Sequence, residues 1–250
     1  PLHPPAHRGA PVFNETVTHT DGSTSTGTAT EVHALRLLRK AVRRGYRVEA
    51  TRTGGAIIER DVHDGSPVPK KHTVTLEPVQ AIGTLTVTVR RDIAAVEARG
   101  AYLVTAAEPQ FRTSVGRIAA GFASIPPAAS QRLVDRGLVG VGQPYTATSN
   151  GFLPETRVPV RVSLVAQLAM LAQDHRTHTI APAGYVRPAD VGSSSAGRQT
   201  PGGGLLYSRA SPAGCSCRQW SATADGRDDA RRLAREHRQR AAAAFIAALA

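Results

Sequence analysis

The chain has few aromatic residues and only a short apolar run, which argues against two classes of protein, single-strand nucleic-acid binders and membrane-spanning proteins. Aromatic residues make up only 4% of the 250 residues, which leaves few platforms for stacking the bases of a single strand. The longest apolar stretch, residues 241–250, is far shorter than the roughly 20 residues that a membrane helix needs. The composition therefore disfavours a single-strand binder and a membrane-spanning protein.

Cysteine is also scarce, and recognisable export signals are lacking. The two cysteines, Cys215 and Cys217, are separated by one residue and do not make the disulfide framework of a secreted domain. Residues 1–5 lack the basic and then apolar order of a signal peptide. We therefore expect a cytoplasmic protein.

No catalytic motif is recognisable in the sequence. Residues 174–178 carry two histidines three apart, but they lack the glutamate that activates water in the zinc-protease helix. The triple glycine at residues 202–204 is not followed by Lys and Ser or Thr, so it is not a phosphate loop. We expect the protein not to be an enzyme.

The shortage of acidic residues leaves a large positive charge. The chain carries 31 Lys and Arg against 19 Asp and Glu, a formal net charge of +12. Nearly all of the cations are arginines, which hold phosphates through a planar fork and can read guanine edges. A polyanion, and double-stranded DNA first, is the expected partner. Heavy use of Arg, Ala and Gly is equally what a GC-rich genome would impose.

Residues 31–92 are expected to form a helix and a β-hairpin, preceded by a flexible arm over residues 1–30. The arm is rich in Pro and then in Thr, Ser and Gly, without apolar periodicity. Thr30 is placed to cap a helix that Gly45 ends. A Gly-Gly turn then joins two extended runs, and further strands are predicted at 72–76 and 83–89.

Residues 93–180 are expected to form a second domain of short helices and strands. Helices are predicted at 91–99, 113–121 and 126–136, from their glycine stops and from a proline pair at one start. A strand, loop and strand pattern follows over 139–163, and another helix is predicted over 164–173.

The C-terminal part is expected to follow a linker. Residues 181–212 are rich in Gly, Pro and Ser and cannot bury enough surface to order themselves. Residues 213–250 hold a Cys-x-Cys loop and a helix over about 225–250, with acids in its first turn where the helix dipole favours them. The predicted fold class is therefore α+β, with winged-helix-like units of short helices and β-hairpins and a C-terminal helix.

Residues 112–163 resemble the winged helix-turn-helix domain of bacterial regulators. The resemblance rests on the phrase from Arg132 to Val139, which matches the end of a recognition helix, and on the strand pair and Ser163-Leu164 that follow. It implies a helix that presents Ser130, Gln131 and Arg132 to base edges, while wing residues such as Arg157 contact phosphates. A winged-helix fold used for dimerisation or packing is the alternative.

A second basic element lies at residues 35–47. Arginines and a lysine recur there at steps of three and four residues without an intervening acid, opposite Leu35, Leu38 and Val42. We expect this face to contact phosphates, although a merely solvated charged face is the commoner fate of such a run. The expected DNA-contacting residues are Arg36, Arg39, Lys40, Arg43, Arg44, Arg47, Arg52, Ser130, Gln131, Arg132, Arg136 and Arg157.

Cys215, Cys217 and His237 form a partial set of zinc ligands, since zinc takes four ligands of these types. The sequence leaves the fourth ligand open among His175, His178 and Asp225. Reduced thiols packed against Trp220 beside a half-buried histidine are the alternative. The Cys-x-Cys…His tail also resembles uncharacterised proteins of actinobacterial plasmids and phages.

These features predict a nucleoid-associated, double-stranded DNA-binding protein, sequence-specific or architectural, that could form a homodimer. A transcriptional regulator or a mobile-element maintenance factor would fit. The alternative is a non-enzymatic interaction component whose basic surface meets an acidic protein, with the apolar end at residues 245–249 as its docking element.

Overall fold

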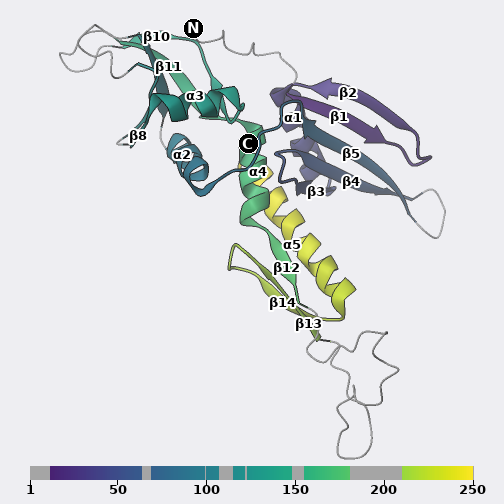
Figure 1. Ribbon diagram of the computed structural model, residues 1–250. Coiled ribbons are helices and arrows are strands. Elements are labelled where there is room, and N and C mark those ends of the chain that lie inside the picture. Colours follow the sequence, from purple (N-terminus) through teal and green to yellow (C-terminus); the bar gives the residue numbers. More distant parts are fainter. Residues whose placement is uncertain are drawn as a thin grey trace, which may run out of the picture. The chain divides into compact units, whose positions relative to one another are not determined.

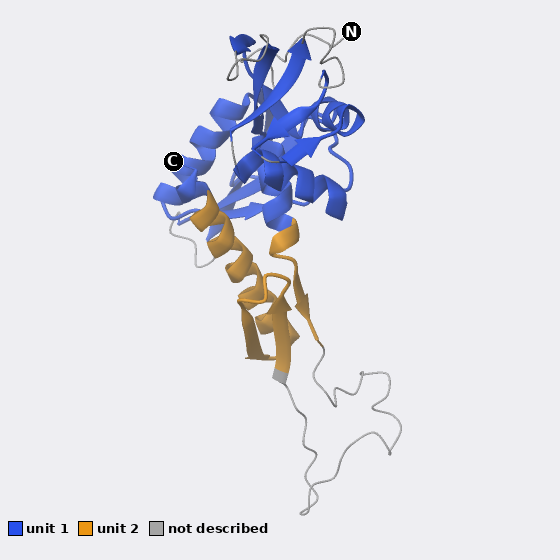
Figure 2. Cartoon of the chain, turned by 90° about the vertical axis from the view of Figure 1, so that its left-hand side faces the viewer, with its two compact units in different colours: residues 1–172, 246–250 blue, residues 173–245 orange. Residues whose placement is uncertain are grey.

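The computed structural model describes residues 12–63, 69–98, 100–106, 115–121, 123–147, 155–180 and 210–249. These residues form helices and three antiparallel sheets, which confirms the predicted α+β class (Figure 1). The chain divides into two compact units, residues 1–172 with 246–250 as unit 1 and residues 173–245 as unit 2 (Figure 2).

The first sheet of unit 1 has five strands and carries helix α1 (Glu31–Arg43). In spatial order the strands are β2 (Thr24–Ala29), β1 (Phe13–Thr18), β5 (Lys70–Pro78), β4 (Ala56–Val62) and β3 (Arg47–Ala50). Because side chains alternate across a strand, the antiparallel register places Phe13, Leu76 and Val48 on one face, and all three are buried. The predicted helix and the following hairpin are confirmed.

The expected flexible arm is wrong for residues 13–29, which form the hairpin of β1 and β2. Asp21 and Gly22 make the turn, where the Asp21 carboxylate accepts hydrogen bonds from the backbone and hydroxyl of Ser23 and Gly22 has φ of +86°. The threonines that look like low-complexity sequence are β-branched residues that suit a pleated strand. Residues 1–11 of the expected arm lie outside the described residues.

The second sheet of unit 1 is built around β11 (Glu155–Val162), which pairs with several strands. Its order is β10 (Tyr145–Ala147), β11, β6 (Ala101–Ala106), β7 (Ile118–Ala120) and β8 (Ala123–Ile125), with β9 (Val139–Val141) also paired to β11. Helices α2 (Val87–Ala98), α3 (Pro127–Asp135) and α4 (Leu164–Asp174) accompany these strands in the sequence. The predicted strand pair over 139–163 and the helices at 126–136 and 164–173 are confirmed.

Two predicted elements in this region are wrong. The helix expected at 113–121 is replaced by a turn and β7, because Gly116 adopts φ of +85° and the chain then pairs with β6 and β8. The strand expected at 83–89 is also absent: residues 81–86 are irregular, and α2 begins at Val87. The Thr86 hydroxyl accepts a hydrogen bond from the backbone of Val89 and so supports the first turn of that helix. Helix α3 therefore follows a β-hairpin and not a helix.

Unit 2 contains a three-stranded sheet and most of the long C-terminal helix. The strands are β12 (Thr177–Thr179), β13 (Ala210–Cys215) and β14 (Ser221–Asp225), and the helix is α5 (Arg227–Ala248). The expected linker at 181–212 lies outside the described residues apart from its last three, which begin β13. None of the described helices combines the length and the apolar character needed to cross a membrane.

Gly54 provides a stability test of the turn between β3 and β4. Its φ is +87°, and an added Cβ would lie 2.5 Å from the carbonyl oxygen of Val165. Gly22 has nearly the same φ, but an added Cβ there would meet no described atom within 4 Å. Gly22→Ala should therefore cost about 1–2 kcal/mol of backbone strain, whereas Gly54→Ala should cost about 1–3 kcal/mol more through overpacking. Urea unfolding of the two variants measures the difference, and equal stabilities would contradict the close approach.

Candidate functional site

Helix α1 presents the largest set of unpaired cations that the sequence predicted. Ala34, Leu38 and Ala41 are buried, and the Thr30 hydroxyl caps the helix by accepting a hydrogen bond of 3.2 Å from the backbone of His33. The opposite side of the helix and its C-cap expose Arg36, Lys40, Arg43 and Arg44, which we call the α1 cationic face. Among the described residues, no carboxylate forms an ion pair with any of these four side chains.

The one acid of α1 is engaged away from this face. The Glu31 carboxylate accepts hydrogen bonds from the backbone of Leu164, at 2.9 Å, and from the guanidinium of Arg161, at 3.1 Å. It stands at the start of the helix, where the helix dipole favours an anion. Glu31 therefore caps α4 and leaves the positive charge of the α1 cationic face uncompensated.

Two other basic residues of the predicted stripe are bonded to groups of the protein itself. Arg39 is partly buried, and its guanidinium donates to the carbonyl oxygen of Leu249. Arg47 is neutralised by Asp61, at 2.6 Å, and lies 3.6 Å from the carboxylate of Glu59. The prediction that Arg39 and Arg47 contact DNA is therefore not supported by their environment, since each already has a partner within the protein.

A hollow of about 430 Å³ lies beside the α1 cationic face. It is lined by Arg36, Arg39, Val42, Arg43, Ile246 and Ala247. The burial of Ile246 also removes the centre of the apolar end that the sequence suggested as a docking element.

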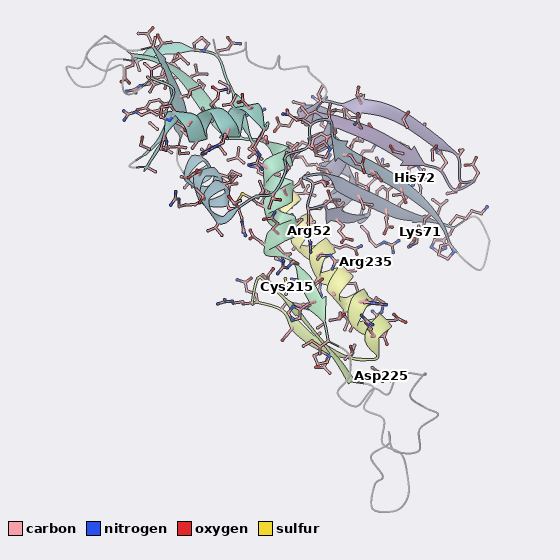
Figure 3. All side chains as sticks on the ribbon, viewed as in Figure 1. Arg52, Lys71, His72, Cys215, Asp225 and Arg235 are labelled. Carbon is pink, nitrogen blue, oxygen red and sulfur yellow. The ribbon has the colours of Figure 1, made fainter. Side chains whose placement is uncertain are left out.

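Arg52, another predicted contact residue, lies in a turn of unit 1. Arg52 is exposed in the turn between β3 and β4 (labelled in Figure 3). The Thr51 hydroxyl accepts a hydrogen bond of 2.9 Å from the backbone of Gly55 and so fixes the turn. Just before β3, hydrogen bonds lower the pKa of Tyr46, because they stabilise its anionic form. The larger effect comes from Arg60 and the next from Arg44.

Of the three residues predicted to read bases, Ser130 is committed to the protein's own structure. Ser130 is fully buried: its hydroxyl accepts from the backbone of Ile118, at 2.9 Å, and donates to the carbonyl oxygen of Ile125, at 3.0 Å. The prediction that Ser130 faces DNA is therefore wrong. Its signal in the sequence was ambiguous, because a serine on a short helix can equally satisfy a neighbouring backbone.

Arg136 and Arg157 are also occupied. The Arg136 guanidinium donates to the carbonyl oxygens of Ile82 and Thr84, which hold the irregular segment before α2. Arg157 pairs with Glu155 at 3.1 Å and lies over the ring of Tyr102, 4.3 Å from its centroid. Both were predicted to contact DNA, and in the structure both bind groups of the protein itself.

The exposed side of α3 keeps two of its predicted contact residues. Gln131 and Arg132 are exposed, and the Gln131 amide donates to the carboxylate of Asp135 at 2.6 Å. Arg132 is the one cation of the predicted recognition helix that remains exposed to solvent. The described part of α3 thus offers little for reading bases.

In unit 2 the predicted metal ligands lie together, and His175 joins them. His175 Nδ1 is 3.3 Å from His237 Nε2 and 3.9 Å from Cys215 Sγ, and Cys217 Sγ is 3.5 Å from His237 Nε2. All four ligand atoms lie within 4.8 Å of one another. We call this group the Cys-His cluster; Figure 3 labels Cys215 in it. The other two candidates for a fourth ligand, His178 and Asp225, are not part of it.

Ser216 fixes the cluster by tying two distant segments together. Its hydroxyl donates to the carbonyl oxygen of Asp174, at 2.8 Å, and accepts from the backbone of Arg176, at 3.0 Å. The residue between the two cysteines thus holds the segment that carries His175. No spacing rule in the sequence marks a serine for this role, so sequence reasoning missed it.

A tight turn and a stacked ring complete the surroundings of the cluster. The backbone of Arg218 donates to the carbonyl oxygen of Cys215 at 3.0 Å, and Arg218 itself adopts φ of +60°. The Trp220 ring stacks on His237 with centroids 4.7 Å apart and an interplanar angle of 9°. Burial raises the pKa of the Cys215 thiol, and burial and then His175 lower the pKa of His237, which keeps its imidazole neutral.

Comparison with known proteins gives no relative to name. No family model, no curated protein and no solved structure matches the chain.

The buried hydroxyl of Ser130 gives a second stability test. Ser130→Ala would leave the backbone N–H of Ile118 without its partner inside the protein, at a cost of about 1–3 kcal/mol. Ser124→Ala is the matched control, because Ser124 lies on the adjacent β8 with its residue exposed. Urea unfolding should show a lower free energy of unfolding for Ser130→Ala alone, and equal losses in both variants would refute the structural role.

Proposed function

We propose that the protein is a non-enzymatic binder of double-stranded DNA that contacts the phosphate backbone through the α1 cationic face. The observation that carries the proposal is the charge pattern of α1. Four exposed cations lie on one helix, and the helix's single acid is bound to Arg161 and to the backbone of Leu164. The net charge of +12 points to the same class of partner.

The contacts are proposed to position the duplex and not to read its sequence. Phosphate contacts from Lys and Arg supply affinity that depends on salt and carries no direct sequence information. Of the three residues expected to reach base edges, Ser130 is buried and the Gln131 amide donates to Asp135, which leaves Arg132. An architectural role therefore fits the described residues better than sequence-specific regulation.

An acidic protein is the second candidate partner, because the same unpaired cations would attract its carboxylates. Guanidinium groups bind both carboxylates and phosphates through paired hydrogen bonds. The two partners differ in charge spacing: a duplex presents phosphates at regular intervals along a rod. Binding to duplex in the presence of a flexible polyanion such as heparin distinguishes them.

The charge on α1 should set the salt dependence of binding. We predict that Arg36→Gln combined with Arg43→Gln raises the Kd for random duplexes of any sequence. The double variant should also reduce the slope of log K against log salt by about 2, one unit for each lost phosphate contact. Fluorescence anisotropy with a labelled random duplex over a salt series measures both quantities.

Arg91→Glu is the matched control, since it lowers the net charge by as much as the double variant. Arg91 is exposed on α2 and lies 3.5 Å from Asp92. If the effect is general attraction to a basic protein, the control and the double variant will change the slope equally, and the assignment to α1 fails. A wild-type complex that heparin dissolves at trace concentration would favour the acidic-protein candidate.

A further inference from the structure

We infer that the Cys-His cluster of unit 2 is a structural zinc site with four protein ligands, independent of the proposed DNA binding. A tetrahedral zinc ion, with bonds of about 2.3 Å to sulfur and about 2.0–2.1 Å to nitrogen, holds two nitrogens about 3.3 Å apart and a sulfur and a nitrogen about 3.6 Å apart. The corresponding separations are 3.3 Å between His175 Nδ1 and His237 Nε2, and 3.5 and 3.9 Å for the two sulfur–nitrogen pairs. These three separations are close to those around one tetrahedral ion, and no two of the four ligand atoms are more than 4.8 Å apart.

The ligand chemistry selects zinc and a structural role. Two thiolates and two imidazoles in a tetrahedron are a set that zinc prefers, whereas oxygen ligands suit magnesium and calcium. Four protein ligands leave no open position for water, which a catalytic zinc site keeps. Both cysteines are free of disulfide bonds, and Cys215 is buried.

The ligands reach the cluster from three separate parts of unit 2. His175 follows α4, the two cysteines lie at the end of β13 and in the turn after it, and His237 lies in the middle of α5. Ser216 holds the first two parts together through the carbonyl oxygen of Asp174 and the backbone of Arg176. Arg238, the neighbour of His237, donates to the hydroxyl of Thr177 on β12 and ties in the helix. Hydrogen bonds therefore hold the segments that carry the ligands, as groups bonded to the ligands do in known metal sites.

The described residues of unit 2 include no fully buried large apolar side chain. The largest fully buried side chains among the described residues all lie outside residues 173–245. The buried side chains among the described residues of unit 2 are all small: Ser211, Ala213, Cys215, Ala230, Ala234 and Ala242. A small unit with so little apolar burial commonly needs a metal or a disulfide as a staple. One zinc ion would join the sheet and the helix at a single point.

Metal analysis and cobalt substitution of the full chain test the site. The purified protein should contain one zinc per chain, and Co²⁺ added after zinc removal should give the strong visible bands of a tetrahedral site together with thiolate charge transfer. Cobalt should also quench Trp220, the single tryptophan, because its ring stacks on His237. A chain that takes up no zinc at micromolar free metal, or a cobalt spectrum typical of octahedral coordination, would overturn the proposal.

Variants assign the ligands. Cys217→Ser and His175→Gln should each weaken zinc binding at least about 100-fold, more than the roughly 10–100-fold typical of changes in residues that only hydrogen-bond to a ligand. His178→Gln is the control, since it removes a neighbouring histidine on β12 that is outside the cluster and should leave the affinity unchanged. If these ligand variants do not fold, His237→Cys keeps four ligands and should strengthen the thiolate charge-transfer band of the cobalt form. An unchanged cobalt spectrum in His237→Cys would exclude His237 as a ligand.

Discussion

The shortage of carboxylates is the constraint that decides how this chain arranges its charges. Several acids of unit 1 are paired with arginines of the same unit, among them Asp61 with Arg47, Glu155 with Arg157 and Glu31 with Arg161. Exposed ion pairs of this kind contribute little to stability. With the acids used in this way, α1 keeps a row of cations that face solvent, and the proposed contact with phosphates follows from that imbalance.

The two units differ in the size of the side chains that they bury. Unit 1 buries large aliphatic side chains and one phenylalanine, and it uses polar groups to satisfy irregular backbone, as Ser130 and Arg136 do. Unit 2 buries small side chains around a sheet of three strands, so hydrophobic burial alone supports it weakly. The proposed zinc site would stabilise unit 2, as the packing of the apolar core stabilises unit 1. Loss of the metal would therefore be expected to affect unit 2 while leaving unit 1 folded.

The sequence predicted elements well where local signals were strong. The Thr30 cap, the glycines that end helices and the proline pair before α3 gave helices close to their observed limits. Prediction failed where pairing with distant strands outweighed the local pattern. The sequence predicts an arm where β1 and β2 form a hairpin, and a helix where β7 lies. A short alternating or polar run does not reveal whether a partner strand is available.

The types of metal ligand could be predicted from the sequence, but which of the candidate residues come together could not. The Cys-x-Cys pair and His237 were identified from residue type, whereas the choice of His175 over His178 and Asp225 depends on how residues 174–176 contact the turn after β13 within unit 2. For the basic residues, the sequence shows the charge of each side chain but not the group that it binds in the fold. Whether an arginine is free or bound to a carbonyl, as Arg136 is, depends on contacts more than 50 residues away in the sequence.

The central claim, that the α1 cationic face contacts duplex DNA, can be tested directly by footprinting the lysines. The chain has only three, at positions 40, 70 and 71, and Lys40 alone lies on α1. Lysine acetylation read by mass spectrometry, with and without saturating duplex, compares their accessibilities in one sample. The account predicts that duplex slows modification of Lys40 and leaves Lys70 and Lys71 unchanged. Equal modification of Lys40 in the free and the bound protein would contradict it.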